Sequence, residues 1–181
     1  MGTLKTTNIQ SISGSGTVTL GTSGETFTVP SGVTLTNSGT ATGFNNPAFM
    51  VTLSGTQNIT TATWTKILFD SEIYDTNSTF ASNKFTPGVA GIYNFQLQVT
   101  LDDLDDGKNL FLKIYKNGSA EGTSGTRVRA AGTEKTTSWC NWSNSANTTD
   151  YYEAYVYHDI GSTEELRNDY STIWMAQRIG T

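Results

Sequence analysis

The chain has one histidine, His158, and one cysteine, Cys140, and these two side chains are the first candidates for nucleophilic or acid–base chemistry. A catalytic histidine needs a nucleophile and a carboxylate beside it, but the sequence has no Gly-x-Ser-x-Gly turn to present a serine. Asp159 points to the opposite face if it shares a strand with His158. Cys140 has no histidine or second cysteine near it in the sequence. We therefore predict no catalytic residue, a surface position for His158 at a strand end, and a buried, unreactive Cys140.

Four carboxylates crowd into residues 101–109, Leu-Asp-Asp-Leu-Asp-Asp-Gly-Lys-Asn, which we expect to be a loop between two strands. A hard cation such as calcium relieves the repulsion between crowded carboxylates. The run does not follow the EF-hand pattern, since Leu104 stands where a ligand is needed and Lys113 where the closing glutamate belongs. Two interpretations stay open, a solvated turn, which is the commoner one, and a calcium site. The ligands of that site would be Asp102, Asp103, Asp105 and Asp106.

Two tryptophans, Trp139 and Trp142, flank Cys140 in a run rich in Asn and Ser. Two neighbouring indoles in a polar setting could form an exposed platform on which a sugar stacks, and packing in the core is the alternative. A second candidate for contact with a partner is the loop expected at residues 121–129, which carries Arg127 and Arg129.

The composition limits the classes of protein to which the chain can belong. Its 181 residues allow one domain of ordinary size and a short additional segment. Only 15% of the residues are charged, the net charge is -5 and no basic cluster is present, so we expect no nucleic acid partner. No apolar run is long enough for the core of a signal peptide or for a membrane span, so we expect neither.

The chain falls into two segments of different character, which we divide after Gly43. Residues 1–43 are made mostly of Gly, Ser and Thr, whereas all four Trp and all eight Tyr come later. Within the first segment apolar residues flank a single residue at Val18 and Leu20, Phe27 and Val29, and Val33 and Leu35, the period of two typical of strands. One chain of this kind buries too little apolar surface to order itself. We therefore predict a β-rich neck that is ordered by three copies about a threefold axis, with a flexible linker as the alternative.

The second segment, residues 44–181, predicts an all-β domain. Short runs rich in β-branched and aromatic residues are separated by Gly, Asn or Asp, and no stretch has a helical period with caps at both ends. In the stretch Lys-Phe-Thr-Pro-Gly-Val-Ala-Gly-Ile-Tyr-Asn-Phe, Pro87 and Gly88 indicate a turn and Gly91 a bend before a strand. The residues expected to share one face of that strand are Tyr93, Phe95, Leu97 and Val99.

Seven marks of the second segment, taken in order, resemble the globular heads of the complement-1q family, a jelly roll related to tumour necrosis factor. They are Ala48-Phe49, Phe69-Asp70, Tyr74-Asp75, FTPGVAGIYNF (residues 85–95), LKIYKNG (112–118), DYYEAYVYHD (150–159) and STIWMAQRI (171–179). The last run departs from the family's closing motif at residues 173–175. The resemblance implies a homotrimer that recognises varied partners and is not an enzyme, and calcium is held by some heads of the family.

The first segment is similar to the necks of bacteriophage fibre and virion surface proteins, in which β-rich repeats precede a compact head. Together the two resemblances imply a trimeric, non-enzymatic protein of the virion surface, such as a small fibre, a tail-fibre tip or a capsid decoration protein. Residues 1–43 would attach it to other virion proteins, and the head would bind a host-surface glycan or protein. A soluble lectin-like module of cellular origin is the alternative, and a polysaccharide depolymerase is a third hypothesis.

Overall fold

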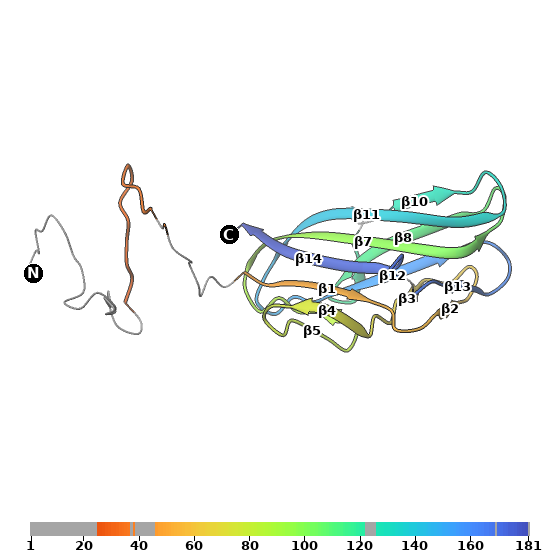
Figure 1. Ribbon diagram of the computed structural model, residues 1–181, viewed down its shortest axis with the longest axis horizontal. Helices are drawn as coiled ribbons and strands as arrows, with labels where there is room; N and C mark the ends of the chain where they lie inside the picture. Colours follow the sequence, from red (N-terminus) through yellow and green to blue (C-terminus); the bar gives the residue numbers. More distant parts are fainter. Residues whose placement is uncertain (1–24, 37, 39–45, 122–125, 169, 181) are drawn as a thin grey trace, which may run out of the picture. The chain divides into compact units, whose positions relative to one another are not determined.

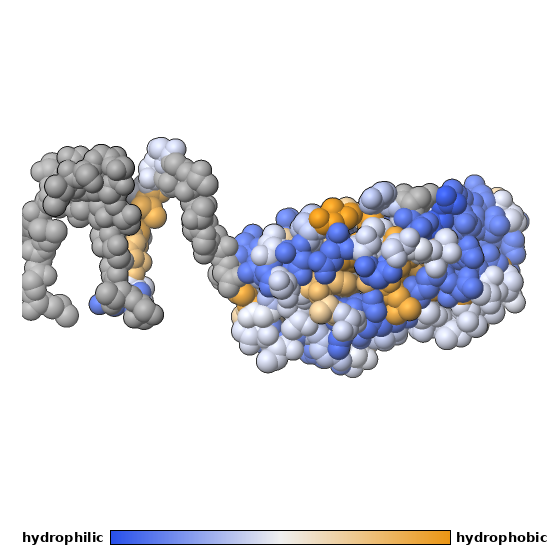
Figure 2. Space-filling model, turned by 60° about the horizontal axis from the view of Figure 1, so that its bottom comes forward, coloured by the Kyte–Doolittle hydropathy of each residue, from blue (hydrophilic) through white to orange (hydrophobic). Residues whose placement is uncertain are grey.

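The computed structural model describes residues 25–36, 38, 46–121, 126–168 and 170–180. The chain divides into two units, Met1–Gly43 and Phe44–Thr181. In the first unit residues 25–36 contain a turn at Ser31 and Gly32 and no strand. Their apolar side chains at Phe27, Val33 and Leu35 are 62%, 59% and 71% exposed. Figure 2 colours a stretch of the first unit orange, as hydrophobic. Residues 25–36 form no strand in the single chain, and the neck ordered by three copies stays a prediction. The predicted pair Val18 and Leu20 lies outside the described residues.

The second unit, the head, consists of two antiparallel sheets, which Figure 1 shows as two layers, with β11, β7, β14 and β1 side by side in one and β8 and β12 in the other. The first sheet contains β2 (Gln57–Ile59), β13 (Glu164–Leu166), β7 (Gly91–Leu104), β14 (Ile173–Gly180), β1 (Ala48–Thr52) and β4 (Ser71–Asp75) in this order, with β11 (Glu134–Ala146) also paired to β7. The second contains β10 (Thr126–Arg129), β8 (Asn109–Lys116), β12 (Tyr152–His158), β6 (Lys84–Phe85) and β5 (Phe80–Ala81), with β3 (Thr65–Lys66) on β12 and β9 (Ser119–Ala120) on β8.

The core lies between the two sheets, and alternate residues of each strand contribute their side chains to it. In β7 the predicted inward set, Tyr93, Phe95, Leu97 and Val99, is at most 1% exposed. The residues of β7 between them, Asn94, Gln96 and Gln98, are exposed or half-buried. This alternation is the mark of a sheet with one face packed and one face solvated, and the predicted all-β sandwich is confirmed.

Aromatic rings fill one part of this core. Phe49 of β1 lies 4.5 Å from Phe85 and 5.0 Å from Trp174, measured between ring centroids, so it joins residues from both sheets. Phe95 of β7 in turn lies 4.5 Å from Tyr152 of β12. Burial of each such side chain stabilises the fold by about 1.5–3 kcal/mol, so this cluster fixes the two sheets face to face.

The predicted bend before β7 is present, and it requires glycine for a specific reason. Gly91 has φ 155°, and a Cβ atom there would lie 2.5 Å from the Gly180 carbonyl oxygen and 2.5 Å from Nε of Arg178. The strand therefore begins where β14 approaches its backbone too closely for a side chain. Gly88, at φ 67°, makes the preceding turn, and the Tyr93 hydroxyl donates to the Val89 carbonyl oxygen at 2.8 Å.

A search of the described residues finds no helix that could cross a membrane.

Candidate binding surfaces

The two tryptophans that were predicted to form a sugar platform lie on opposite faces of β11. Trp139 is 66% exposed, whereas Trp142 is 7% exposed and stacks on Phe95, with 5.5 Å between ring centroids. They are three positions apart, and in a strand an odd difference in position places two side chains on opposite faces. The predicted platform of two indoles is therefore wrong, because Trp142 belongs to the core.

The four aspartates of residues 101–109 are not gathered into one site. Asp102 and Asp103 belong to β7, so the predicted loop begins only after Leu104. The Asp102 carboxylate pairs with Arg167 at 2.6 Å, and the Asp105 carboxylate accepts a hydrogen bond from Thr133 at 3.1 Å. In the part of the chain that the structure describes, no three acidic, histidine or cysteine side chains lie close enough together to hold a metal ion. The calcium prediction thus gains no support from the geometry of the single chain.

The two arginines predicted in a contact loop lie in strand β10, and residues 122–125 of that loop are outside the described residues. Both side chains are exposed. Nε of Arg129 donates to the Gly107 carbonyl oxygen at 3.0 Å, so this arginine fastens the turn between β7 and β8. The Arg127 guanidinium lies 5.9 Å from the centroid of the Phe111 ring, at the surface of the second sheet.

The surface position predicted for His158 is wrong. The residue ends β12 but is fully buried, because it shares the inward register of Tyr152, Ala154 and Val156. Its Nε2 lies 2.9 Å from the Ile59 carbonyl oxygen, so the imidazole ties β12 to the end of β2. Cys140 is buried, as predicted, and burial raises the pKa of its thiol to about 11, which keeps it protonated and unreactive.

The solvent side of the first sheet presents a surface without charges, which sequence reasoning did not single out. Cross-strand registers align three rows of outward side chains on it. The first row is Asn141, Gln96, Met175, Met50 and Tyr74, the second is Trp139, Gln98 and Ile173, and the third is Ser143, Asn94, Gln177 and Ala48. We call these three rows the uncharged face. The alternation along the two strands already indicated this surface in the sequence. The outward positions in residues 92–98 of β7 and 137–145 of β11 carry no charged residue, and most of them are Asn, Gln or Ser.

Hydrogen bonds between neighbouring strands order the polar side chains of the uncharged face. Nδ2 of Asn94 donates to the Asn141 amide oxygen and to the Ser143 hydroxyl, both at 3.1 Å. Two apolar side chains lie open beside this network, Trp139 at 66% and Tyr74 at 43% exposure. A surface with ordered amides, Met, Trp and Tyr, and no charge has the composition of the centre of a protein interface.

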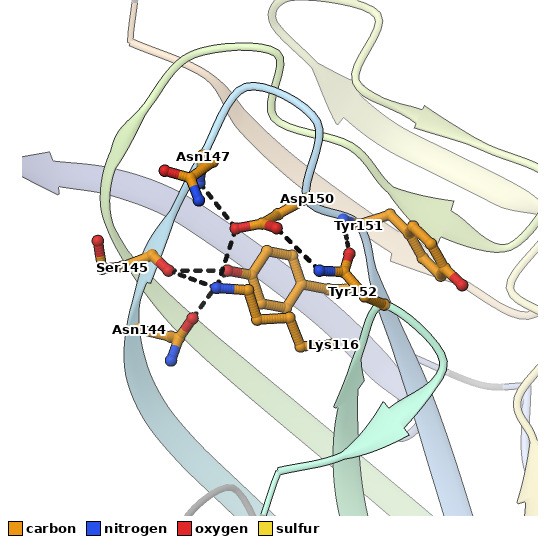
Figure 3. Close-up of polar contacts among 8 residues, drawn as sticks. Lys116, Asn144, Ser145, Asn147, Asp150, Tyr151 and Tyr152 are labelled. Carbon is orange, nitrogen blue, oxygen red and sulfur yellow. Dashed lines mark hydrogen bonds and ion pairs between the residues drawn. The ribbon is translucent and has the colours of Figure 1, made fainter.

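A second ordered region lies where the loop between β11 and β12 meets the turn after β8 (Figure 3). The Asp150 carboxylate accepts hydrogen bonds from the Asn117 side chain and from the Asn147 backbone, each at 2.8 Å, and pairs with Lys116 at 2.9 Å. Burial opposes ionisation of Asp150, but these donors and the Lys116 charge outweigh burial and lower its pKa to about 2. The carboxylate is therefore structural, and it fixes two loops at this end of the sandwich.

Comparison with known protein families shows to which family the head belongs. The family model for the C1q domain matches residues 48–138, from β1 to the middle of β11. The chain belongs to the C1q domain family. A search of curated protein sequences gives no match.

Solved structures of known proteins share the C1q-like fold of the head. Murine APRIL at pH 5.0 aligns with a TM-score of 0.57 at 9% identity, over 74% of this chain and 99% of that one. The Eiger TNF from S. frugiperda gives 0.56 at 9% identity, over 75% and 92%. The globular domain of the zebrafish complement 1qA protein gives 0.54 at 14% identity, over 74% and 97%. The head is therefore a C1q- and TNF-like jelly roll, a kind of domain that generally serves as a non-enzymatic binding module.

Proposed function

We propose that the chain is a trimeric, non-enzymatic protein of the bacteriophage virion surface. The C1q-like head would bind a ligand on the host surface, and residues 1–43 would attach the protein to the virion. It would act as a small fibre, a tail-fibre tip or a capsid decoration protein. Its partners are two further copies of itself, other virion proteins at residues 1–43, and a glycan or protein of the host surface.

The uncharged face carries the trimer part of the proposal. An outward sheet face of a small acidic protein that lacks charges and exposes Trp139 and Tyr74 gains free energy when a second copy covers it. In a closed trimer each head offers the same surfaces to its neighbours, so every copy of the face is covered. A threefold axis also brings the three N-terminal segments together, as the predicted neck requires.

The described part of the first segment supports an attachment role. Phe27, Val33 and Leu35 alternate with polar residues and remain largely exposed in the single chain. Such side chains need a cover, and three copies winding together, or a virion protein holding them, would provide it. The similarity of this composition to phage fibre necks is the reason for placing the protein on a virion.

Three heads held on one axis bind by avidity. Each head then needs only a weak contact, because the second and third binding events are intramolecular. This suits a surface that meets a host displaying many copies of one ligand.

A soluble binding module of cellular origin is the second candidate. It is favoured by the solved structures that resemble the head, which include murine, insect and zebrafish proteins. Both candidates share the trimer and the binding head, and they differ in what residues 1–43 hold.

Two measurements test the proposal. Native mass spectrometry of the full chain beside a chain that begins at Phe44 gives the oligomeric state of each, and we expect a trimer for the full chain. Monomers in both samples would contradict the threefold arrangement. Immunogold labelling with antibodies to the head then gives the location. Labelled phage particles are expected, and label on cell-derived material alone would favour the cellular module.

A further inference from the structure

The solvent side of the second sheet carries aromatic residues where an antiparallel sandwich usually presents polar ones. In β8 and β12 the inward residues are fully buried, whereas Phe111 and the directly paired Tyr157 face outward and are half-buried. Trp64, from the loop before β3, joins them and is 36% exposed. The ring centroids of Trp64 and Phe111 each lie 5.5 Å from that of Tyr157.

The structure holds this group of rings in place. The Ala62 amide donates to the His158 carbonyl oxygen at 2.7 Å, and Thr65 pairs with Val156. The loop that carries Trp64 is therefore bonded to β12 on both sides of the indole. A rigid aromatic surface loses little conformational entropy when a ligand stacks on it.

The rings line an open hollow of about 350 Å³ whose remaining lining residue is Asp159. The Asp159 carboxylate accepts hydrogen bonds from the backbone and side-chain nitrogens of Asn109, at 2.7 and 2.6 Å. Burial opposes its ionisation, but these donors prevail and lower its pKa, so the carboxylate is charged and keeps lone pairs for further donors. The Lys113 ammonium lies 5.9 Å from the centroid of the Trp64 ring, at the outer limit of a cation–π contact. The strand register places Lys113 on the other side of the Phe111 and Tyr157 pair from Asp159.

Resting on the binding role proposed for the head, we propose that Trp64, Phe111, Tyr157 and Asp159 form a binding site for a neutral sugar of a host-surface glycan. The aliphatic C–H face of a pyranose packs against the ring faces, its hydroxyl groups donate to Asp159, and the Lys113 ammonium donates to a ring or hydroxyl oxygen.

Other ligands fit this surface less well. A quaternary ammonium group needs open space between aromatic walls, but ring centroids 5.5–6.4 Å apart are already in mutual contact. An acidic sugar whose carboxylate lay beside Asp159 would be repelled, and the cations Lys113 and Arg127 lie instead over the Trp64 and Phe111 rings, each 5.9 Å from the ring centroid. A purely apolar partner would leave both the Asp159 and Lys113 charges to be desolvated.

The test is saturation-transfer NMR of the full-length protein with the methyl glycosides of galactose, glucose, mannose and N-acetylglucosamine. N-acetylneuraminic acid and choline serve as the alternative probes. We expect at least one neutral glycoside to receive saturation, strongest on the ring protons of one face. Trp64→Ala should weaken its binding about tenfold or more. Asp159→Asn, which keeps an oxygen acceptor but loses the charge, should weaken it severalfold.

The matched control is Tyr170→Ala, because Tyr170 is 70% exposed and precedes β14 of the other sheet. Its binding should stay within twofold of the parent, and circular dichroism checks that each variant is folded. No saturation of any neutral glycoside, equal binding by folded Trp64→Ala, or binding of only choline or N-acetylneuraminic acid would overturn the inference. Native mass spectrometry of the same samples separates the two proposals. A trimer without sugar binding counts against the sugar site alone, whereas a monomer counts against the proposed function.

Discussion

The contribution of Asp150 to stability can be predicted as a free energy, because its hydrogen bonds and its ion pair with Lys116 are also what lowers its pKa. The side chain is 9% exposed and holds the turn after β8 to the loop between β11 and β12. Its pKa falls from the usual 3.8 to about 2, and each pKa unit corresponds to about 1.36 kcal/mol. The charged carboxylate therefore stabilises the fold by about 2 kcal/mol.

The sign of the pH dependence follows from the direction of the shift. A carboxyl group with a lowered pKa in the folded state contributes its full stability above pH 3.8, and this contribution is lost as the pH falls through about 2. Asp150→Asn should therefore lower the free energy of unfolding by about 2 kcal/mol at pH 7 and by only about 1 kcal/mol near pH 3.

Urea denaturation of parent and variant at the two pH values measures both differences. The control is Asp106→Asn, which removes a carboxylate from an exposed turn and should change the free energy of unfolding by less than about 0.5 kcal/mol at either pH. The reasoning is refuted if Asp150→Asn costs the same at pH 3 as at pH 7, because the ion pair and hydrogen bonds would then not depend on the charge.

Three further predictions concern the uncharged face, the core and the thiol. Gln96→Glu adds a charge to the middle of the uncharged face without disturbing the buried side of β7. This variant should dissociate from trimer to monomer at micromolar protein concentration, as measured by native mass spectrometry. The control Ser119→Glu, on the exposed strand β9, should stay trimeric. A fully trimeric Gln96→Glu would show that the interface lies elsewhere. Trp142→Ala should cost about 3–5 kcal/mol in urea denaturation, because the indole packs on Phe95, and a cost no larger than that of Trp139→Ala would contradict its place in the core. At pH 8 the Cys140 thiol should resist an aromatic disulfide reagent until urea is added, because burial raises its pKa to about 11, and rapid labelling of the folded protein would contradict this.

The fold and the inward side chains of its longest strand could be predicted from the sequence. Tyr93, Phe95, Leu97 and Val99 follow a period of two, and a period of two fixes which residues share a face whatever the sheet packs against. The turn at Pro87 and Gly88 and the buried Cys140 followed from equally local rules. The same period, applied to Trp139 and Trp142, would have separated the two indoles.

Only the tertiary structure decided how distant residues meet. The period of two already groups His158 with the inward residues of β12, but nothing in its own segment marks the Ile59 carbonyl oxygen, 99 positions away, as its partner. The four aspartates of residues 101–109 are close together along the chain, yet Asp102 forms an ion pair with Arg167 of a distant loop. The uncharged face needs β11, β7, β14, β1 and β4 in register, and the sugar site needs Trp64 beside Tyr157. Local periodicity is written in the sequence of each strand, but the order of strands in a sheet follows from packing the whole chain, and that order assembles the surfaces that bind.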